Sequence, residues 1–129
     1  MSYGYKTQIP GSFQEAINKV TAQLKQEGFG ILTTIDVKST LKKKLDVEFD
    51  NYCILGACNP PFAYKALQTE KDIGLLLPCN VIVYEDSDQA HIVVSALLPT
   101  IAMSMIENPD LKQVAIQVEA KLKNVIDSL

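Results

Sequence analysis

The apolar residues of this chain repeat with two different periods, and each period marks a type of predicted element. Stretches that alternate loosely between apolar and polar side chains, or that are rich in β-branched residues, predict strands. Five stretches have this character: residues 3–9, 29–37, 51–58, 79–85 and 90–96. A turn-like Asp-Ser-Asp-Gln at 86–89 joins the last two strands as a hairpin.

Apolar residues at helical spacing predict a first helix over 13–27. Its apolar stripe consists of Phe13, Ala16, Ile17, Val20 and Leu24. Ser12 and Glu15 have the spacing of a capping box, in which a hydroxyl and a carboxylate satisfy backbone donors at a helix start. Gly28 suits the left-handed residue that follows a helix end. The short amphipathic stretch at 38–45 predicts a helical turn with a solvated lysine face.

Asparagine and proline signals predict two further helices. Asn59 followed by Pro60 predicts an Asn cap and a helix start, because proline lacks the N–H that would be unpaired there. This helix should extend to about residue 71. Its inward-facing residues are predicted to be Ala63, Ala66 and Leu67. Asn108, followed by Pro-Asp, caps the last helix in the same way. The apolar stripe of the last helix consists of Leu111, Val114, Val118, Leu122, Val125 and Leu129.

Together these elements predict a single domain over residues 1–129, of the α+β class. Their order is strand, helix, four strands with helical insertions, and helix, or β-α-β4-α. This order favours a mainly antiparallel sheet of about five strands with helices packed on one face.

Composition and charge exclude several classes of protein. The formal net charge is -3 with lysines and acids interspersed, whereas a nucleic-acid-binding domain favours a basic stripe, so we expect no nucleic-acid partner. The longest uncharged run, 92–106, is too short for a membrane helix and contains Pro99, so we expect no membrane span. The N-terminus lacks the pattern of a signal peptide, and the cysteines number three, which is odd. Both observations favour reduced thiols and a cytoplasmic location.

Two Cys-Asn pairs, Cys58-Asn59 and Cys79-Asn80, are the main candidate for chemistry. The first pair ends the third predicted strand and the second pair begins the fourth. If these strands are antiparallel neighbours, Cys58 and Cys79 come close at one edge of the sheet. Cys58 also precedes a helix start, where the partial positive charge can lower the pKa of a thiol. The candidate ligand-binding residues are therefore Cys58, Asn59, Cys79 and Asn80.

Several interpretations of the two pairs stay open. Two adjacent thiols could bind a soft metal, form a reversible disulfide or attack an electrophile. A closed zinc site needs four ligands, and His91, the only histidine, is a possible third beside Cys58 and Cys79. In the structural alternative the cysteines pack as small hydrophobes, Asn59 only caps a helix and Asn80 satisfies backbone groups. Cys53 lies on the opposite face of its strand from Cys58 and is interpreted as a core residue.

Other segments add little chemistry. The sequence has no Ser-His-Asp order, no glycine-rich phosphate loop and no paired-carboxylate signature, so it indicates no enzyme class and no cofactor. The acidic turn at 85–88 lacks the glycine and distal glutamate of a calcium loop. The apolar connector at 95–109 contains Met103 and Met105, whose flexible thioethers suit a ligand pocket or a dimer contact; otherwise the connector packs on the core.

The combination "YCILGACNPPFAYKAL" and "IGLLLPCNVIVYED" resembles the bacterial and archaeal family of domain of unknown function 302. The resemblance extends from "GFGILTTIDVKSTLKKKL" through the Leu-Leu-Pro at 97–99 to the last helix. It implies a TBP-like α+β fold and homodimers. It implies no catalytic residues; what it transfers is the motif at Cys58, Asn59, Pro60, Pro78, Cys79 and Asn80.

Three functions follow as hypotheses. The first is a small cytoplasmic module that binds a ligand or a metal at the Cys58/Cys79 edge. The second is a thiol-based redox protein that cycles these two cysteines. The third is a structural or interaction domain without a ligand. Replacing either cysteine should abolish an activity in the first two cases and lower only stability in the third.

Overall fold

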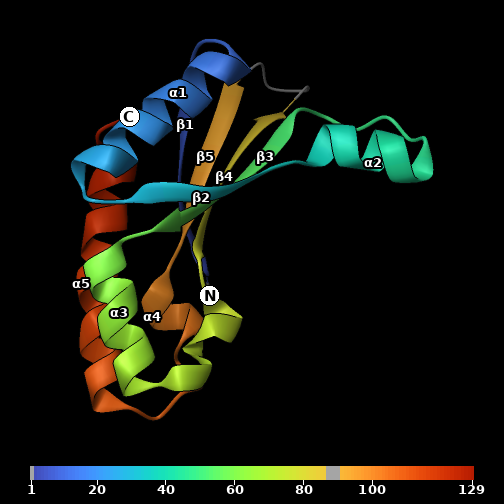
Figure 1. Ribbon diagram of the computed structural model, residues 1–129. Coiled ribbons are helices and arrows are strands. Elements are labelled where there is room, and N and C mark those ends of the chain that lie inside the picture. Colours follow the sequence, from blue (N-terminus) through green and yellow to red (C-terminus); the bar gives the residue numbers. More distant parts are fainter. Residues whose placement is uncertain (1, 87–90) are drawn as a thin grey trace.

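A computed structural model of the chain describes residues 2–86 and 91–129. The strands within these residues are β1 (Gly4–Ile9), β2 (Gly30–Asp36), β3 (Tyr52–Cys58), β4 (Cys79–Asp86) and β5 (His91–Leu97). The helices are α1 (Phe13–Gln26), α2 (Val37–Leu45), α3 (Pro60–Thr69), α4 (Pro99–Ala102) and α5 (Pro109–Asp127), with a 3-10 helix η1 at Lys71–Leu76. Figure 1 shows their arrangement. The element order confirms the predicted α+β class.

The five strands form one sheet in the order β1-β5-β4-β3-β2, and each neighbouring pair is antiparallel. The predicted antiparallel sheet is therefore confirmed, including the pairing of β3 with β4 on which the position of the two cysteines depends. The β4–β5 hairpin is confirmed as well. Its predicted turn, beyond Asp86, lies outside the described residues.

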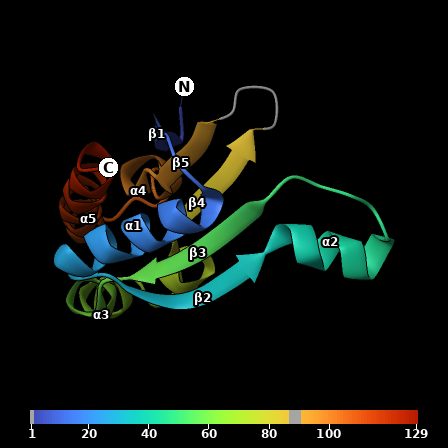
Figure 2. The same ribbon diagram turned by 90° about the horizontal axis from the view of Figure 1, so that it is seen from above.

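Two long helices cover one face of the sheet, and this face holds the main core (Figure 2). In β3 the alternate residues Cys53, Leu55 and Ala57 are at most 3% exposed, as the period of a strand predicts. Apolar residues of α1 and α5 pack against them, among them Val20 and Leu122. Burial of these side chains is the main force that holds the helices on the sheet.

The predicted helix signals work as expected at three ends. The Ser12 hydroxyl accepts a hydrogen bond from the Glu15 N–H at 3.1 Å, which caps α1. Gly28 follows α1 with φ 88°, the left-handed conformation that glycine adopts without steric cost. The Asn108 side chain accepts from the N–H groups of Asp110 and Leu111 and so caps α5.

The structure departs from the prediction between residues 37 and 76. The expected helical turn is a nine-residue helix, α2, because the Asp36 carboxylate caps it by accepting from the Ser39 N–H at 2.9 Å. Figures 1 and 2 show α2 extending away from the rest of the molecule. The helix expected to reach residue 71 ends at Thr69, and the chain tightens into η1, which buries Ile73 completely. Leu67, predicted to face inward, is 41% exposed.

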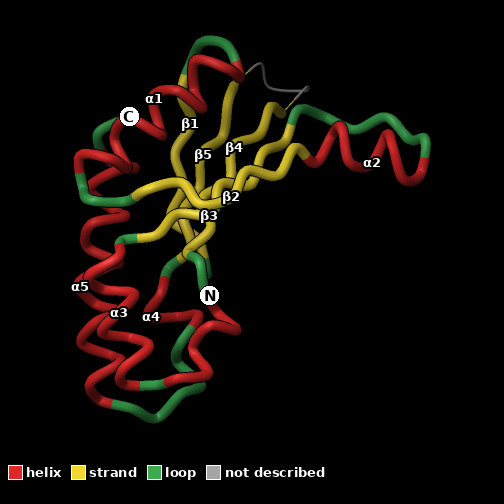
Figure 3. Tube along the Cα trace, viewed as in Figure 1, coloured by secondary structure: helices red, strands yellow, loops and turns green. Residues whose placement is uncertain are grey.

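A second apolar cluster lies among α3, η1, the α4 region and the first turns of α5. Figure 3 shows these helical segments grouped at one end of the sheet. The buried members of the cluster are Ala66, Ile73, Met103, Leu111 and Ala115. The predicted connector at 95–109 contributes Met103 to this cluster, whereas Met105 is 76% exposed. None of the helices among the described residues is long and apolar enough to cross a membrane.

Candidate functional site

The end of β3 and the beginning of β4 meet at the edge of the sheet that faces the second cluster. The register pairs Cys79 with Ala57, so Cys58 is the next residue beyond the pair. The two thiols are close enough for Cys58 to affect the pKa of Cys79. The structure therefore brings these two predicted residues together.

Both thiols lie in apolar surroundings, which favour the protonated form. Burial, and next the neighbouring Cys58, raises the pKa of Cys79 from 9.0 to about 11. Burial also raises the pKa of the partly exposed Cys58. The lowered pKa expected for Cys58 beside a helix start is therefore wrong, because desolvation opposes the thiolate there. Cys53 is 3% exposed, as predicted for a core residue.

Asn59 occupies the cap position of α3 but does not cap the helix with its side chain. Pro60 and Pro61 fill the first two helical positions and have no N–H to donate. Instead, the Asn59 Nδ2 donates a hydrogen bond to the backbone carbonyl of Glu27 at 3.1 Å. The amide thus joins the end of α1 to the start of α3, and Asn59 is only 7% exposed.

A cavity of about 350 Å³ opens between this sheet edge and the second cluster. Cys58, Asn59 and Cys79 all line it. The rest of the lining is apolar, with no Asp, Glu, Lys, Arg or His. Its larger apolar residues are Phe29, Leu32, Phe62, Leu67, Leu77, Met103, Val114 and Val118. The cavity lies where the two cores meet, because its wall takes residues from both.

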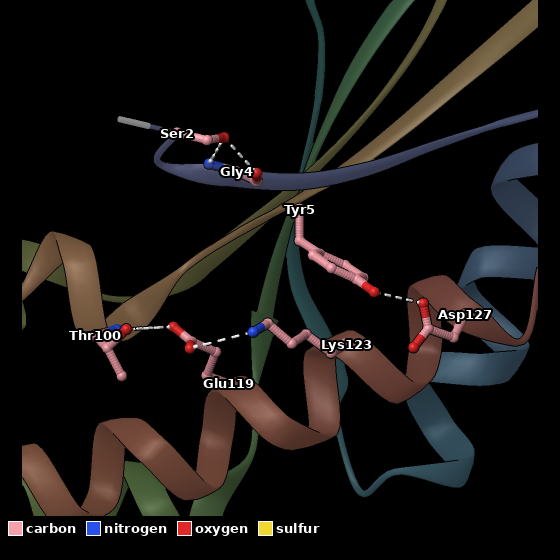
Figure 4. A network of polar contacts seen from close by, with 7 residues as sticks. All are labelled: Ser2, Gly4, Tyr5, Thr100, Glu119, Lys123 and Asp127. Carbon is pink, nitrogen blue, oxygen red and sulfur yellow. Dashed lines mark hydrogen bonds and ion pairs between the residues drawn. The ribbon is translucent and has the colours of Figure 1, made fainter.

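Helix α4 contributes Pro99 to the cavity wall, and a polar contact with α5 fixes its position. The Glu119 carboxylate accepts from the Thr100 hydroxyl at 2.7 Å and from the Thr100 N–H at 3.1 Å (Figure 4). The ammonium of Lys123 lies 3.7 Å from the same carboxylate. The connector that carries Met103 is therefore held against α5 by a paired, largely buried acid.

Two predicted site residues do not reach the cavity. Asn80 follows the buried Cys79 and so points to the other face of the sheet, where it is exposed. His91 pairs with Asp86 at the opposite end of β4, seven residues from Cys79 or about 23 Å along the strand. His91 is exposed, and the proposed contact with the two thiols is wrong. The described residues contain no group of three His, Cys, Asp or Glu side chains placed to hold a metal.

Most residues of the cavity wall carry no functional signal in the sequence. Phe29 directly follows Gly28, and Leu32 lies in β2. Neither residue belongs to a motif. Phe62 directly follows the two prolines after Asn59, and Leu77 precedes Pro78. Only the apolar connector with Met103 signalled a pocket in advance. For Phe62 and Leu77, the one further signal is their position beside the two Cys-Asn pairs.

Comparisons with known proteins agree with this geometry. The model of the family described as "Domain of unknown function DUF302" matches residues 5–129. Among solved structures, the chain is similar to an uncharacterized conserved protein DUF302 from Bacillus stearothermophilus, with 30% sequence identity, 98% of each chain covered and a TM-score of 0.90. No curated protein matches the sequence. Since the family match covers nearly the whole chain, this protein belongs to the family of domain of unknown function DUF302.

Proposed function

We propose that the protein is a binding module for a small, uncharged, apolar molecule, which occupies the cavity at the Cys58/Cys79 edge of the sheet. The observation that carries this proposal is the cavity itself: about 350 Å³, with an apolar wall and no charged side chain. Ligand sites in proteins are typically concave and mainly apolar, with a few polar groups that orient the ligand. Cys58, Asn59 and Cys79 are those groups here.

A metal site at the same place has less support. Soft metals bind thiolates, and the raised pKa values of Cys58 and Cys79 make both thiolates costly. His91, the expected third ligand, is at the far end of the sheet. A metal would therefore need ligands from outside the described part of one chain.

A redox function is the second candidate, since the two thiols are neighbours and free. Disulfide formation begins with attack by a thiolate, so raised pKa values slow it at neutral pH. Three free cysteines also fit a reducing compartment, which supports a cytoplasmic location.

The test is native mass spectrometry of the anaerobically purified protein, followed by titration with a fluorescent apolar probe, 2-naphthol. We expect either a copurified apolar molecule or saturable probe binding. The variant Ala63→Phe places a ring in the cavity wall and should abolish binding. Ala120→Phe, on the exposed surface of α5, is the matched control and should bind normally. Equal binding by both variants would reject the cavity as the site.

Thiol counting separates the other hypotheses. A mass loss of two hydrogens after mild oxidant, with Cys58 and Cys79 joined in the peptide map, would favour redox cycling. Unchanged thiols with no ligand and no probe binding would leave only the structural or interaction domain.

We also propose that two copies form a homodimer through β2. β2 is the outermost strand on one side of the sheet, so one of its hydrogen-bonding sides is unpaired within the described part of the chain. Its exposed apolar residues include Leu32, which is 66% exposed, and Ile35, which is 46% exposed. An exposed apolar edge strand is a template for pairing with another chain, and a second β2 would fit it. Light scattering after size-exclusion chromatography should show a dimer in the wild type and a monomer in Ile35→Lys. A monomeric wild type would exclude the dimer.

A further inference from the structure

The polar groups of the cavity wall differ in what they can offer a ligand. The thiols of Cys58 and Cys79 are weak hydrogen-bonding groups. The Asn59 amide is the strong one, and the residue is only 7% exposed. Its amide therefore dominates the directional chemistry of this site.

The orientation of this amide is fixed by its hydrogen bond. Nδ2 donates to the Glu27 carbonyl at 3.1 Å, so Oδ1 is the end of the group left as an acceptor. Pro60 and Pro61 have no N–H, and the third helical residue, Phe62, does not donate to the Asn59 side chain either, since α3 has no side-chain cap. Among the described residues, no hydrogen bond to the Asn59 Oδ1 accompanies the one from Nδ2. In the part of the chain that the structure describes, no buried side-chain nitrogen or oxygen lacks a hydrogen-bond partner, so the Asn59 Oδ1 is an accessible acceptor and not a desolvated, unpaired one. A ligand hydroxyl or N–H that donates to it replaces a bond to water, and the gain is that of one net hydrogen bond between neutral groups.

From these contacts we infer that the ligand is a neutral, largely hydrocarbon molecule with one hydroxyl or N–H group, which donates to the Asn59 Oδ1. This inference rests on the proposed function of the cavity and adds the polar group of the ligand. A charged ligand is disfavoured, because nothing in the cavity wall would neutralise its charge after desolvation.

The size of the cavity limits the ligand further. An engineered apolar cavity of roughly 150 Å³ holds one benzene molecule. The cavity here is about 350 Å³, so a molecule of two fused rings fits it. The geometry thus points to bicyclic or similarly sized aliphatic alcohols, phenols and N–H heterocycles.

The experiment compares two probes of nearly the same shape, 2-naphthol and 2-methylnaphthalene, at pH 7. The first carries a hydroxyl donor where the second carries a methyl group. Dissociation constants are measured for the wild type and for Asn59→Ala, and the quantity of interest is the ratio of the two constants in each protein. A net hydrogen bond between neutral groups corresponds to roughly a twofold to tenfold change in affinity. We therefore expect the preference for 2-naphthol to fall by about that factor in Asn59→Ala.

The ratio separates failure of this inference from failure of the proposed function. If both probes bind and the ratio is the same in the two proteins, the donor to Asn59 is wrong and the apolar cavity stands. If neither probe binds the wild type, both are wrong. Because Asn59→Ala also removes the bond to Glu27, nuclear magnetic resonance of the wild type gives a second test that needs no variant. The side-chain amide signals of Asn59 should shift with 2-naphthol and much less with 2-methylnaphthalene; equal shifts would overturn the inference.

Discussion

The buried thiol of Cys79 should make the stability of the fold fall with rising pH, in a way that Cys79→Ala does not share. Burial, followed by the effect of Cys58, raises the pKa of Cys79 from 9.0 to about 11. The folded protein therefore keeps this proton to a higher pH than the unfolded chain does. The stabilisation is fully present below pH 9 and is lost as the pH rises through the window from 9 to 11. The difference of two units between the folded and unfolded pKa, at 1.36 kcal/mol per unit, corresponds to a loss of about 3 kcal/mol in the free energy of unfolding.

The assay is urea unfolding of the wild type and Cys79→Ala at pH 8 and pH 11, both with reductant. Lysines and tyrosines titrate in the same window, but they do so in both proteins, so their effect cancels in the comparison. Between pH 8 and pH 11 the free energy of unfolding of the wild type should fall by about 2–3 kcal/mol more than that of Cys79→Ala. Cys58→Ala is the control and should keep most of the loss, since burial is the larger cause of the shift at Cys79.

Equal losses in the wild type and Cys79→Ala would refute the reasoning, because the thiol would then titrate as it does in water. Alkylation gives an independent check. At pH 8 the thiolate fraction of a thiol with a pKa of about 11 is about one hundredth of the thiolate fraction of a thiol with a pKa of 9.0. Iodoacetamide should therefore modify Cys79 about 100-fold more slowly in the folded protein than in urea at the same pH.

Three further substitutions test the structure around the cavity. Glu119→Ala removes the acceptor for both donors of Thr100 and should lower the free energy of unfolding by about 1–3 kcal/mol in urea titrations; an unchanged midpoint would mean that α4 is held by packing alone. Asn108→Ala removes the cap of α5 and should cost about 1–2 kcal/mol by thermal unfolding followed by circular dichroism, with no loss contradicting the cap. Gly56→Ala should cost about 1–3 kcal/mol, because a methyl group there would clash with the Thr33 hydroxyl and lie 2.9 Å from the Pro78 Cγ, and a variant as stable as the wild type would show that both neighbours can move.

The elements that the sequence predicts well are those with a local physical cause. The strand character of β3 follows from alternate burial, and Cys53 and Leu55 are buried as that alternation requires. Helix α1 begins at the Ser12 cap and is followed by the left-handed Gly28, each readable within a few residues. The proximity of Cys58 and Cys79 needed one assumption beyond local signals, an antiparallel β3–β4 pair, and this assumption is confirmed.

The parts that sequence could not supply depend on contacts between distant residues. Whether Asn59 caps α3 or binds elsewhere is decided by the Glu27 carbonyl, 32 residues away. The position of His91 is decided by the register of β4 with β5, which sets it opposite Asp86. The cavity wall combines Met103 of the connector with Cys58 and Cys79 at the end of the sheet, residues that only the folded chain brings together. No periodicity in the sequence encodes these distances.

The burial that forms the cavity also restricts the chemistry of its cysteines. An apolar wall favours an apolar ligand, because transferring apolar ligand surface from water into the cavity lowers the free energy of binding. The same wall raises the pKa of Cys58 and Cys79 and so works against thiolate chemistry, which both metal binding and disulfide exchange require. Ligand binding and thiolate chemistry therefore compete for this site, and a ligand that excludes more water from it should suppress thiol reactivity further. The protonated cysteines then serve as small apolar groups where the two cores meet, and Asn59 is the group that orients a ligand by a hydrogen bond.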